Sequence, residues 1–490
     1  MEPIHDLRLL LAILAPLVGA GLVMLTGNRP NTRETCSFFT AATLFVLTAS
    51  MIPAVLAGKT LYFCVFHLLG GLEIALRADG LSMVFALCAS FLWVVTVFYS
   101  AGYMRGLNEH EQTRFNTCFA LALFGAVGCA FSNNLLTLYL FYEIVSICTY
   151  PLVAHHQDEE SYESGKKYLT YLTATAKGLV LPAMVVIYVL TGTLDFANNI
   201  NTGILPPDVN RWVVTALYAC CIIGFAKNGV MPFHNWLPSA MVAPTPVSAL
   251  LHAVAVVKVG VFSTVRVMLY VFGVDTMRAL NLGLPTAYFV SITIIIASIV
   301  ALSKDNLKAR LAYSTVSQLS YIILGVALMT RPGIEGGLIH IANHAFSKIT
   351  LFFCAGAIYV ATHKKNISEM NGLGRAMPFT FGAFALASLS MIGAPPVAGF
   401  VTKWYLLNGA FDAGSVGIII VLLISTLLNA AYFAPVVYNG FFGKTSQADT
   451  DHKYGEAHPA LVVPLVITAI ISVLIGIYPG FLMHFVRAVL

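Results

Sequence analysis

The feature of this sequence that most restricts its fold is a series of uninterrupted apolar runs, each about 20 residues long. A run of this length matches a helix that crosses the hydrocarbon core of a bilayer. A membrane β-barrel would instead show segments of about ten residues that alternate in polarity. Because backbone polar groups in lipid must be satisfied within the spanning segment, the runs predict an all-α polytopic membrane protein.

Composition supports this fold class. The chain of 490 residues is 58% hydrophobic and 10% charged, whereas soluble domains average about 25% charged residues. A soluble fold, a disordered chain, a collagen-like fibre and a nucleic-acid-binding protein are therefore excluded. The nine cysteines form no C-x-x-C motif, so the sequence predicts no iron–sulfur cluster, zinc site or disulfide framework, and no cofactor or metal is expected.

About fourteen membrane spans follow from marking apolar runs bounded by charges or by Pro and Gly clusters. The segment 60–78 is also apolar but is broken by Gly70 and Gly71, so the count depends on how it is read. The first run follows acidic residues rather than a basic segment, which favours a retained span over a cleaved signal. The predicted spans are 7–26, 35–57, 79–104, 115–132, 134–154, 168–191, 213–230, 245–272, 284–303, 311–330, 334–361, 378–410, 414–441 and 460–487.

The distribution of lysine and arginine predicts the orientation. Loops after the odd-numbered spans carry fourteen of the 27 basic residues, and the opposite side carries seven. Positive charge is enriched in cytoplasmic loops. We therefore expect an inner (cytoplasmic) membrane protein with both termini on the outer, periplasmic side.

The remaining basic residues fall inside the spans. Arg266 is near a span end and is expected to snorkel to the interface. Each of the other charged side chains in the spans would cost about 2.5–3.5 kcal/mol at the bilayer centre. We therefore expect these side chains to face a protein interior or a water-filled cavity. An ion pair that fixes helix register is the structural alternative, but buried lysines can also gain and lose protons near neutral pH. These charges are Glu143, Lys177, Lys227, Lys258, Lys348 and Lys403.

Histidines extend this row of ionisable residues. His340, His344 and Lys348 follow one another at four-residue spacing, which places them on one helix face, and His252 precedes Lys258 by about two turns. The two histidines could chelate a metal, but the same stretch offers no carboxylate or cysteine to complete the site. Haem binding would require histidines on a facing helix. Simple packing is a third alternative. A proton relay between neutral and charged imidazoles fits the spacing best.

Two spans are interrupted near a lysine. The seventh span breaks after Lys227 and the twelfth breaks before Lys403. Proline breaks a helix and leaves backbone groups that protein or water must satisfy, so each break marks a cavity. Breaks five spans apart predict two inverted five-helix repeats, each a half-channel. The prolines at the breaks in helices 7 and 12 are Pro232, Pro238, Pro395 and Pro396.

The repeats divide the chain into four regions. These are N-terminal helices 1–3 in residues 1–110, a first half-channel of helices 4–8 in 111–275, a second half-channel of helices 9–13 in 280–442, and a C-terminal loop with helix 14 in 443–490.

At these motifs the sequence resembles a known family: the antiporter-like, proton-conducting subunits of respiratory complex I, of Mrp-type cation/proton antiporters and of membrane-bound hydrogenases. The resemblance covers about residues 75 to 440. The length resembles the shorter members, such as the Mrp D subunit or its hydrogenase counterparts, whereas the stretch HNWLPSAMVAPTPVSALLHA is more similar to the larger subunits. The stretches that carry the resemblance are NNLLTLYLFYEIVSICTYPLV, GFAKNGVMPFHNWLPSAMVAPTPVSALLHAVAVVKVGVF, SKDNLKARLAYSTVSQLSYI, HIANHAFSKITLFFCAGAIY and MIGAPPVAGFVTKWYL.

The resemblance implies fourteen core helices and a polar axis along the membrane midplane. It implies that Glu143 pairs with Lys227. Our hypothesis is that loosening this pair leaves Lys227 desolvated, so that its proton passes inward toward Lys258. Lys348 would help to connect Lys258 to Lys403, the exit group. The expected proton-transfer residues are Glu143, Lys227, His252, Lys258, His340, His344, Lys348 and Lys403.

We therefore expect a proton-translocating, non-redox subunit of a multi-subunit membrane complex, either an Mrp-type Na⁺/H⁺ antiporter or a redox-driven pump. Its partners would be other membrane subunits, the lipid bilayer, protons and Na⁺, and not nucleic acid. No G-x-G-x-x-G follows a strand, so redox chemistry would lie on a partner. The alternatives are a stand-alone solute transporter, a haem-bearing electron carrier and a bicarbonate-accumulation subunit driven by a cation gradient.

Overall fold

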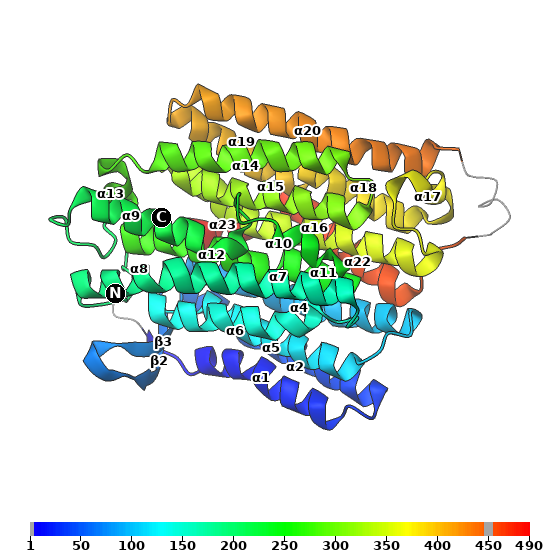
Figure 1. Ribbon diagram of the computed structural model, residues 1–490, viewed down its shortest axis with the longest axis horizontal. Helices are drawn as coiled ribbons and strands as arrows, with labels where there is room; N and C mark the ends of the chain where they lie inside the picture. Colours follow the sequence, from blue (N-terminus) through cyan, green and yellow to red (C-terminus); the bar gives the residue numbers. More distant parts are fainter. Residues whose placement is uncertain (1–3, 445–453) are drawn as a thin grey trace.

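The computed structural model describes residues 4–444 and 454–490. Its long helices lie side by side along the long axis of the molecule (Figure 1). A small sheet of order β1-β2-β3 lies at one end, which we call the sheet end. The opposite end carries the loops 107–111, 154–158 and 363–372, and we call it the loop end. Both β1 and the carboxyl end of α23 lie at the sheet end, so the two ends of the described chain lie on the same side.

The described part of the first half of the chain holds the strands and fifteen helical segments. They are β1 (Ile4–His5), α1 (Arg8–Leu25), α2 (Pro30–Ser50), α3 (Ile52–Leu56), β2 (Leu61–His67), η1 (Leu69–Gly71), β3 (Glu73–Ala78), α4 (Gly80–Gly106), α5 (Gln112–Ala130), α6 (Leu135–Val153), α7 (Glu159–Thr175), η2 (Ala176–Val180), α8 (Leu181–Thr191), α9 (Arg211–Gly224), η3 (Ala226–Asn228), α10 (Trp236–Ser239), η4 (Ala240–Val242) and α11 (Thr245–Ala253).

The described part of the second half is helical. Its elements are α12 (Val256–Val267), η5 (Met268–Phe272), α13 (Val274–Ala279), α14 (Gly283–Ser303), α15 (Leu307–Ala327), α16 (Arg331–Thr362), η6 (Ile367–Glu369), α17 (Leu373–Ala376), α18 (Pro378–Ile392), α19 (Ala398–Asp412), α20 (Val416–Phe442), α22 (Pro459–Ile477) and α23 (Gly480–Arg487). Part of the predicted C-terminal loop, 445–453, lies outside the described residues.

Polar residues at the ends of the apolar runs start the long helices. Asp79, Asn134, Asp158, Asn306 and Thr330 each accept a hydrogen bond from a backbone N–H in the first turn of the following helix. A side chain in this position satisfies one of the N–H groups that have no partner within the helix. Apolar length and a polar cap together therefore explain where these helices begin.

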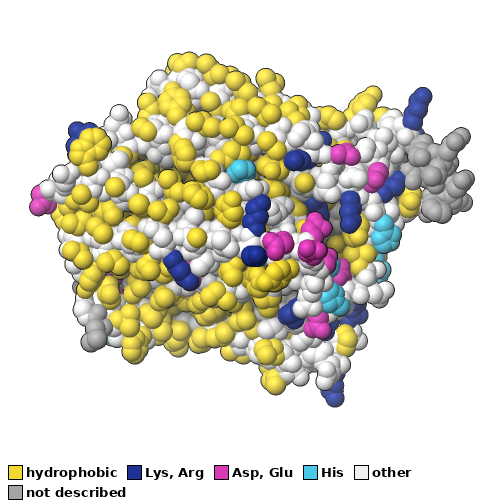
Figure 2. All heavy atoms as spheres, in the orientation of Figure 1, with side chains coloured by type: hydrophobic (Ala, Val, Ile, Leu, Met, Phe, Trp, Pro, Cys, Tyr) yellow, Lys and Arg dark blue, Asp and Glu magenta, His cyan; other side chains and the backbone are white. Residues whose placement is uncertain are grey.

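The membrane-protein prediction is confirmed, and each of the fourteen predicted spans contains a helix or a pair of helices. Ten helices in the described residues are long and apolar enough to cross a bilayer. The other predicted spans are 213–230, 245–272 and 378–410, which are interrupted, and 311–330, where α15 carries more polar residues. Apolar side chains cover much of the surface in Figure 2, and charged side chains gather toward the loop end.

The segment 60–78 is a β-hairpin rather than a span. β2 pairs antiparallel with β3 from Leu61, opposite Ala78, to His67, opposite Glu73. Gly70 and Gly71 have φ angles of 72° and 78°, which the turn requires and which glycine adopts without steric cost. The two glycines that interrupt the apolar pattern therefore mark the tip of the hairpin.

The predicted breaks occur in the seventh and twelfth spans. The seventh opens between α9 and α10, where Trp236 Nε1 donates to the Ala226 carbonyl at 3.0 Å and Met231 N donates to Thr293 Oγ1 at 3.2 Å. The twelfth opens between α18 and α19. The eighth span also breaks, between α11 and α12, where the N–H groups of Val254 and Ala255 share the Leu250 carbonyl. No Pro or Gly stands at that point, so the sequence showed no signal for it.

Helix α16 forms the centre of the bundle. It packs against α4, α11, α15, α18, α19 and α22. Nearly all of its 32 residues are buried, so the helix has no exposed polar face. His340, His344 and Lys348 on this helix are therefore enclosed by protein rather than by lipid.

Candidate functional site

The predicted ionisable residues come from interrupted or central elements of the bundle. Lys227, Lys258, His340, His344 and Lys348 are 3% exposed or less. Their positions are Glu143 on α6, Lys227 on η3, Lys258 on α12, His340, His344 and Lys348 on α16, and Lys403 on α19. His252 lies on α11, but its side chain is outside the described part of the chain.

Lys227 is held by α6 through neutral groups. Its Nζ atom donates to the Tyr142 carbonyl at 2.8 Å and to Ser146 Oγ at 2.7 Å, and lies 3.1 Å from the centre of the Tyr142 ring. Within the described residues, Lys227 makes no ion pair with Glu143. The direct contact implied by the resemblance is therefore absent from this conformation, because the ammonium group of Lys227 is hydrogen-bonded to Tyr142 and Ser146 instead.

Glu143 has a different environment from Lys227. Its Oε1 atom is buried and has no hydrogen-bond partner. The cations that act on its charge are Lys227 and Lys177. Lys177 lies in η2, a π-helical turn in the middle of an apolar span, and its side chain is exposed on the outside of the bundle. The positive charges that act on Glu143 therefore come from one internal lysine and one lysine on the lateral surface.

The closest contact in the site joins Lys258 to α16. Lys258 Nζ lies 2.9 Å from His344 Nδ1. The ring centres of His344 and His340 are 5.7 Å apart, and His340 Nδ1 lies 3.1 Å from Thr402 Oγ1 on α19. These contacts form a chain from the eighth span through α16 to the twelfth.

Lys403 follows Thr402 and lies at the twelfth-span break. Its Nζ atom donates to Thr426 Oγ1 at 2.8 Å and to the carbonyl of Ile392, the last residue of α18. Gly393 has a φ angle of 88°, and a Cβ atom there would lie 2.4 Å from Lys403 Cδ. The break therefore supplies both an acceptor for the ammonium group and the space for its side chain.

Lys348 forms a separate branch. Its Nζ atom donates to Ser314 Oγ at 2.8 Å and to the Leu311 carbonyl at 3.2 Å on α15. The Tyr432 hydroxyl donates to Asn429 Oδ1 at 2.5 Å and lies 3.0 Å from the oxygen of the same serine. Lys348 therefore points toward α15 and α20, away from the direct line between His340 and Lys403.

One step of the predicted axis has no direct contact. Among the residues that the structure describes, no hydrogen bond or ion pair joins Lys227 to Lys258. Their elements touch closely: a Cβ atom on Gly260 of α12 would lie 2.2 Å from the Lys227 carbonyl carbon. Buried polar atoms of this bundle without a protein partner include Ser263 Oγ and Gln318 Nε2. Such atoms usually bind ordered water.

Arg266 corrects one expectation. It does not snorkel: it is fully buried, and its guanidinium binds Asp79 at 2.6 and 3.1 Å. Burial opposes ionisation of Asp79, but the charges of Arg266 and Arg77 hold the pKa of its carboxyl well below the usual value. The pair fixes α12 to the start of α4.

Histidine pairs on α16 do not form a metal-binding group in the described residues. The candidate groups of three ligand residues lie elsewhere, at Cys64, His67 and Glu73 and at Glu109, His110 and His156. Sequence reasoning also missed the neutral partners of the lysines, namely Tyr142, Ser146, Ser314, Thr402 and Tyr432. Hydroxyl groups inside apolar helices were the available signal.

A cavity of about 550 Å³ opens at the loop end. It is lined by the segment 238–245, which joins the seventh-span break to α11, and by residues of both charges. The ionisable residues at its wall include Glu109, His156, Asp158, Glu160, Lys308 and Lys365. The cavity at the loop end is therefore lined in part by the residues that follow the seventh-span break.

Sequence comparison places the chain among membrane subunits. The model of a family described as NADH:quinone oxidoreductase/Mrp antiporter, transmembrane, matches residues 132–429. NADH-quinone oxidoreductase subunit N of Desulforudis audaxviator is 32% identical over 425 residues, 83% of this chain and 82% of that protein. Subunit L of Mycobacterium tuberculosis is 30% identical over 491 residues, 96% and 75% of the two chains. Na⁺/H⁺ antiporter subunit A1 of Staphylococcus haemolyticus is 29% identical over 468 residues, 90% of this chain and 57% of that one.

Two solved structures share the fold. A chain of the Mrp complex from a Dietzia species has a TM-score of 0.88 and 21% identity, with 98% of this chain and 96% of that chain covered. A chain of an archaeal membrane-bound sulfane sulfur reductase has a TM-score of 0.88 and 23% identity, with 99% and 97% covered. The arrangement of the helices is therefore shared along almost the whole length.

Proposed function

Because the chain belongs to the NADH:quinone oxidoreductase/Mrp antiporter family of membrane proteins, we propose that it translocates protons as one subunit of a multi-subunit membrane complex. The observation that carries this proposal is the buried contact between Lys258 and His344 at 2.9 Å. Two basic groups at this distance share one proton position, so protonation of one depends on the other. Such a pair can transfer a proton from one group to the other, whereas a lysine in a permanent ion pair would stay charged.

The proton path follows the contacts along the bundle. A proton enters on the Glu143 side, reaches Lys227, and crosses to Lys258 through water held by buried hydroxyl groups. It then moves to His344, to His340, and past Thr402 to Lys403 at the twelfth-span break. The conformation with Lys227 on Tyr142 and Ser146 is the state in which the pair with Glu143 is open.

The two half-channels of this proposal are residues 111–275 and 280–442. In the first, Lys227 binds a backbone carbonyl and a serine on α6. In the second, Lys348 binds a backbone carbonyl and a serine on α15. The acceptor helices are the fifth and tenth predicted spans, five spans apart, whereas the lysines lie in the seventh and eleventh.

The loop end is proposed to face the cytoplasm. Loops assigned to that side carry fourteen basic residues against seven on the other, which is the bias that orients inner-membrane proteins. Both described ends of the chain would then lie on the outer side. The cavity at the loop end would give protons access to the first half-channel from the cytoplasm.

The driving force is proposed to come from partner subunits, as a redox reaction or as a sodium gradient. Lys177 indicates where one partner binds, because an exposed charge in the middle of a span costs about 2.5–3.5 kcal/mol in lipid. A neighbouring membrane subunit over α6 and η2 would cover this lysine and place its own groups near Glu143.

Proton movement in liposomes that contain the assembled complex tests the function. A pH-sensitive dye inside the vesicles should respond when the redox donor or the sodium gradient is applied. Replacing Lys258 by Met should abolish the response, whereas replacing the exposed Lys59 by Met should not. Uptake of an organic solute by liposomes that contain this chain alone would support a stand-alone transporter and contradict the proposal.

A further inference from the structure

Two loops at the loop end bring three histidines and a glutamate together, and the proposed proton path uses none of them. Glu109 and His110 lie in the loop between α4 and α5, and His155 and His156 lie between α6 and α7. Glu109 Oε2 lies 3.7 Å from His156 Nδ1 and 3.9 Å from both His110 Nδ1 and His155 Nε2. The Glu109 carboxylate is therefore surrounded by imidazole nitrogens.

His155 is unusual within this group because it is fully buried. Neither of its ring nitrogens has a hydrogen-bond partner among the described residues, although Nε2 points toward Glu109. A buried polar side chain without a partner is costly and generally has a ligand or a water. The neutral imidazole is the form that binds metals.

We propose that Glu109, His110, His155 and His156 form a binding site for a divalent transition metal ion of the zinc class. Zinc binds imidazole nitrogen and carboxylate oxygen at about 2.0–2.2 Å in tetrahedral geometry, so its ligand atoms lie about 3.3–3.5 Å apart. The separations of the imidazole nitrogens from Glu109 Oε2, 3.7 and 3.9 Å, exceed this by a few tenths of an ångström. Small side-chain rotations of the partly exposed His110 and His156 would close the gap.

The donor set also selects the kind of metal. Three imidazoles and one carboxylate suit zinc and its neighbours, whereas magnesium and calcium prefer oxygen ligands. The site lies at the rim of the cavity, which Glu109 and His156 help to line. A bound ion would tie the α4–α5 loop to the α6–α7 loop at this opening.

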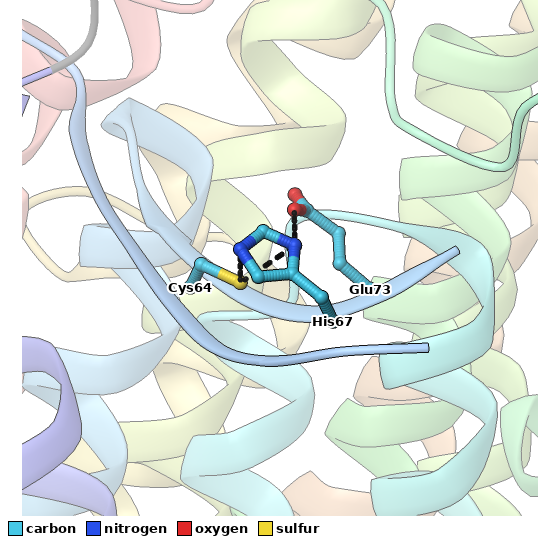
Figure 3. A group of neighbouring side chains, drawn as sticks. All are labelled: Cys64, His67 and Glu73. Atoms are coloured by element: carbon cyan, nitrogen blue, oxygen red, sulfur yellow. Dashed lines mark hydrogen bonds and ion pairs between the residues drawn. The ribbon is translucent and has the colours of Figure 1, made fainter. Parts of the chain in front are cut away.

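A second group of ligand residues lies at the sheet end. Figure 3 shows the His67 ring between the Cys64 thiol and the Glu73 carboxylate on the β2–β3 hairpin, with His67 Nδ1 3.5 Å from Glu73 Oε2. Glu73 also accepts a hydrogen bond from the Tyr62 hydroxyl, and the His67 side chain is 80% exposed. These residues already have partners or face solvent, so the group serves as the comparison site.

Zinc titration of the purified complex, prepared with a tag that lacks histidine, tests the proposal. After removal of bound metal with a chelator, calorimetry with ZnCl₂ should show one zinc site assigned to this chain. The double substitution His110→Gln and His156→Gln should weaken zinc binding by roughly 100-fold or more, since loss of even an outer-shell partner costs about 10–100-fold. His363→Asn is the matched control, because His363 is an exposed histidine at the same end whose φ of 57° Asn also adopts.

Each outcome decides the question. Zinc bound by the control and by a Cys64→Ser, His67→Gln variant, but not by the His110, His156 variant, supports the site. Unchanged zinc affinity in the His110, His156 variant overturns the proposal, as does loss of binding on substitution of the hairpin. X-ray absorption of the zinc complex provides a second readout and should show imidazole scattering without sulfur. Because His110 and His156 are partly exposed, the metal-free variant should unfold at the same temperature as the wild type.

Discussion

Lys258 Nζ on α12 lies 2.9 Å from His344 Nδ1 on α16, although 86 residues separate the two in the sequence. At this separation a single hydrogen lies between the two nitrogens. The charged lysine therefore requires an unprotonated Nδ1, and the imidazole accepts the proton only as the lysine releases it. This coupling makes the pair the central step of the proposed path.

Replacing His344 by Gln should reduce proton transport by roughly 100-fold or more, because an amide can accept a hydrogen bond from Lys258 but cannot carry a proton onward. The variant should still assemble, since glutamine satisfies the buried ammonium group. Proton uptake in vesicles that contain the complex measures the effect. His484→Gln, a substitution of an exposed histidine on α23, is the control, and a wild-type rate for His344→Gln would contradict the relay.

Replacing Glu143 by Gln should abolish transport while the complex assembles. The carboxylate has a buried oxygen without a hydrogen-bond partner and lies under the influence of two lysines. A neutral amide would remove the charge that draws Lys227 away from Tyr142 and Ser146. Glu143→Asp should retain part of the activity, because it keeps the charge on a shorter side chain. Wild-type transport by the amide variant would exclude an ion-pair gate.

Replacing Gly393 by Ala should impair transport without changing any ionisable group. The added Cβ would lie 2.4 Å from Lys403 Cδ, at a φ of 88° that alanine adopts only with strain. Backbone strain of this kind costs about 1–3 kcal/mol, and Lys403 would leave its acceptors. Transport rate and thermal stability should both fall. Gly382→Ala on α18, where a Cβ meets no atom within 4 Å, should be harmless, and equal effects of the two substitutions would refute the argument.

Replacing Asp79 by Asn should destabilise the bundle by about 3–5 kcal/mol, because it leaves the buried Arg266 without its counter-ion. Thermal unfolding of the purified protein in detergent measures this loss, and Asp412→Asn at the exposed end of α19 is the control. Stability of the Asn variant equal to that of the wild type would show that the pair contributes nothing.

The same ion pair predicts a pH dependence. The folded pKa of Asp79 is depressed from its ordinary 3.8, so its contribution to stability is complete above that value. It is lost as the pH falls below about 3.8 toward the folded pKa. The difference in unfolding temperature between the wild type and Asp79→Asn should therefore be constant at neutral pH and should shrink in acid. A difference that is unchanged in acid would contradict this assignment.

The sequence by itself determined the membrane fold, the approximate position of each span and the breaks in the seventh and twelfth. These features depend on local properties of the chain: the length of an apolar run, a proline such as Pro232, or a glycine such as Gly393. The four-residue spacing of His340, His344 and Lys348 also placed them on one helix. Each inference needed only the geometry of a single helix.

Only the tertiary structure decided which side chains meet. Lys227 binds Tyr142 and Ser146 instead of Glu143, Lys348 turns to Ser314, and Arg266 is buried on Asp79. The histidine cluster around Glu109 likewise joins two loops more than 40 residues apart. The rotation of each helix about its axis and its depth relative to its neighbours set these contacts. Many side chains on both partners determine that packing together, so no single stretch of sequence specifies it.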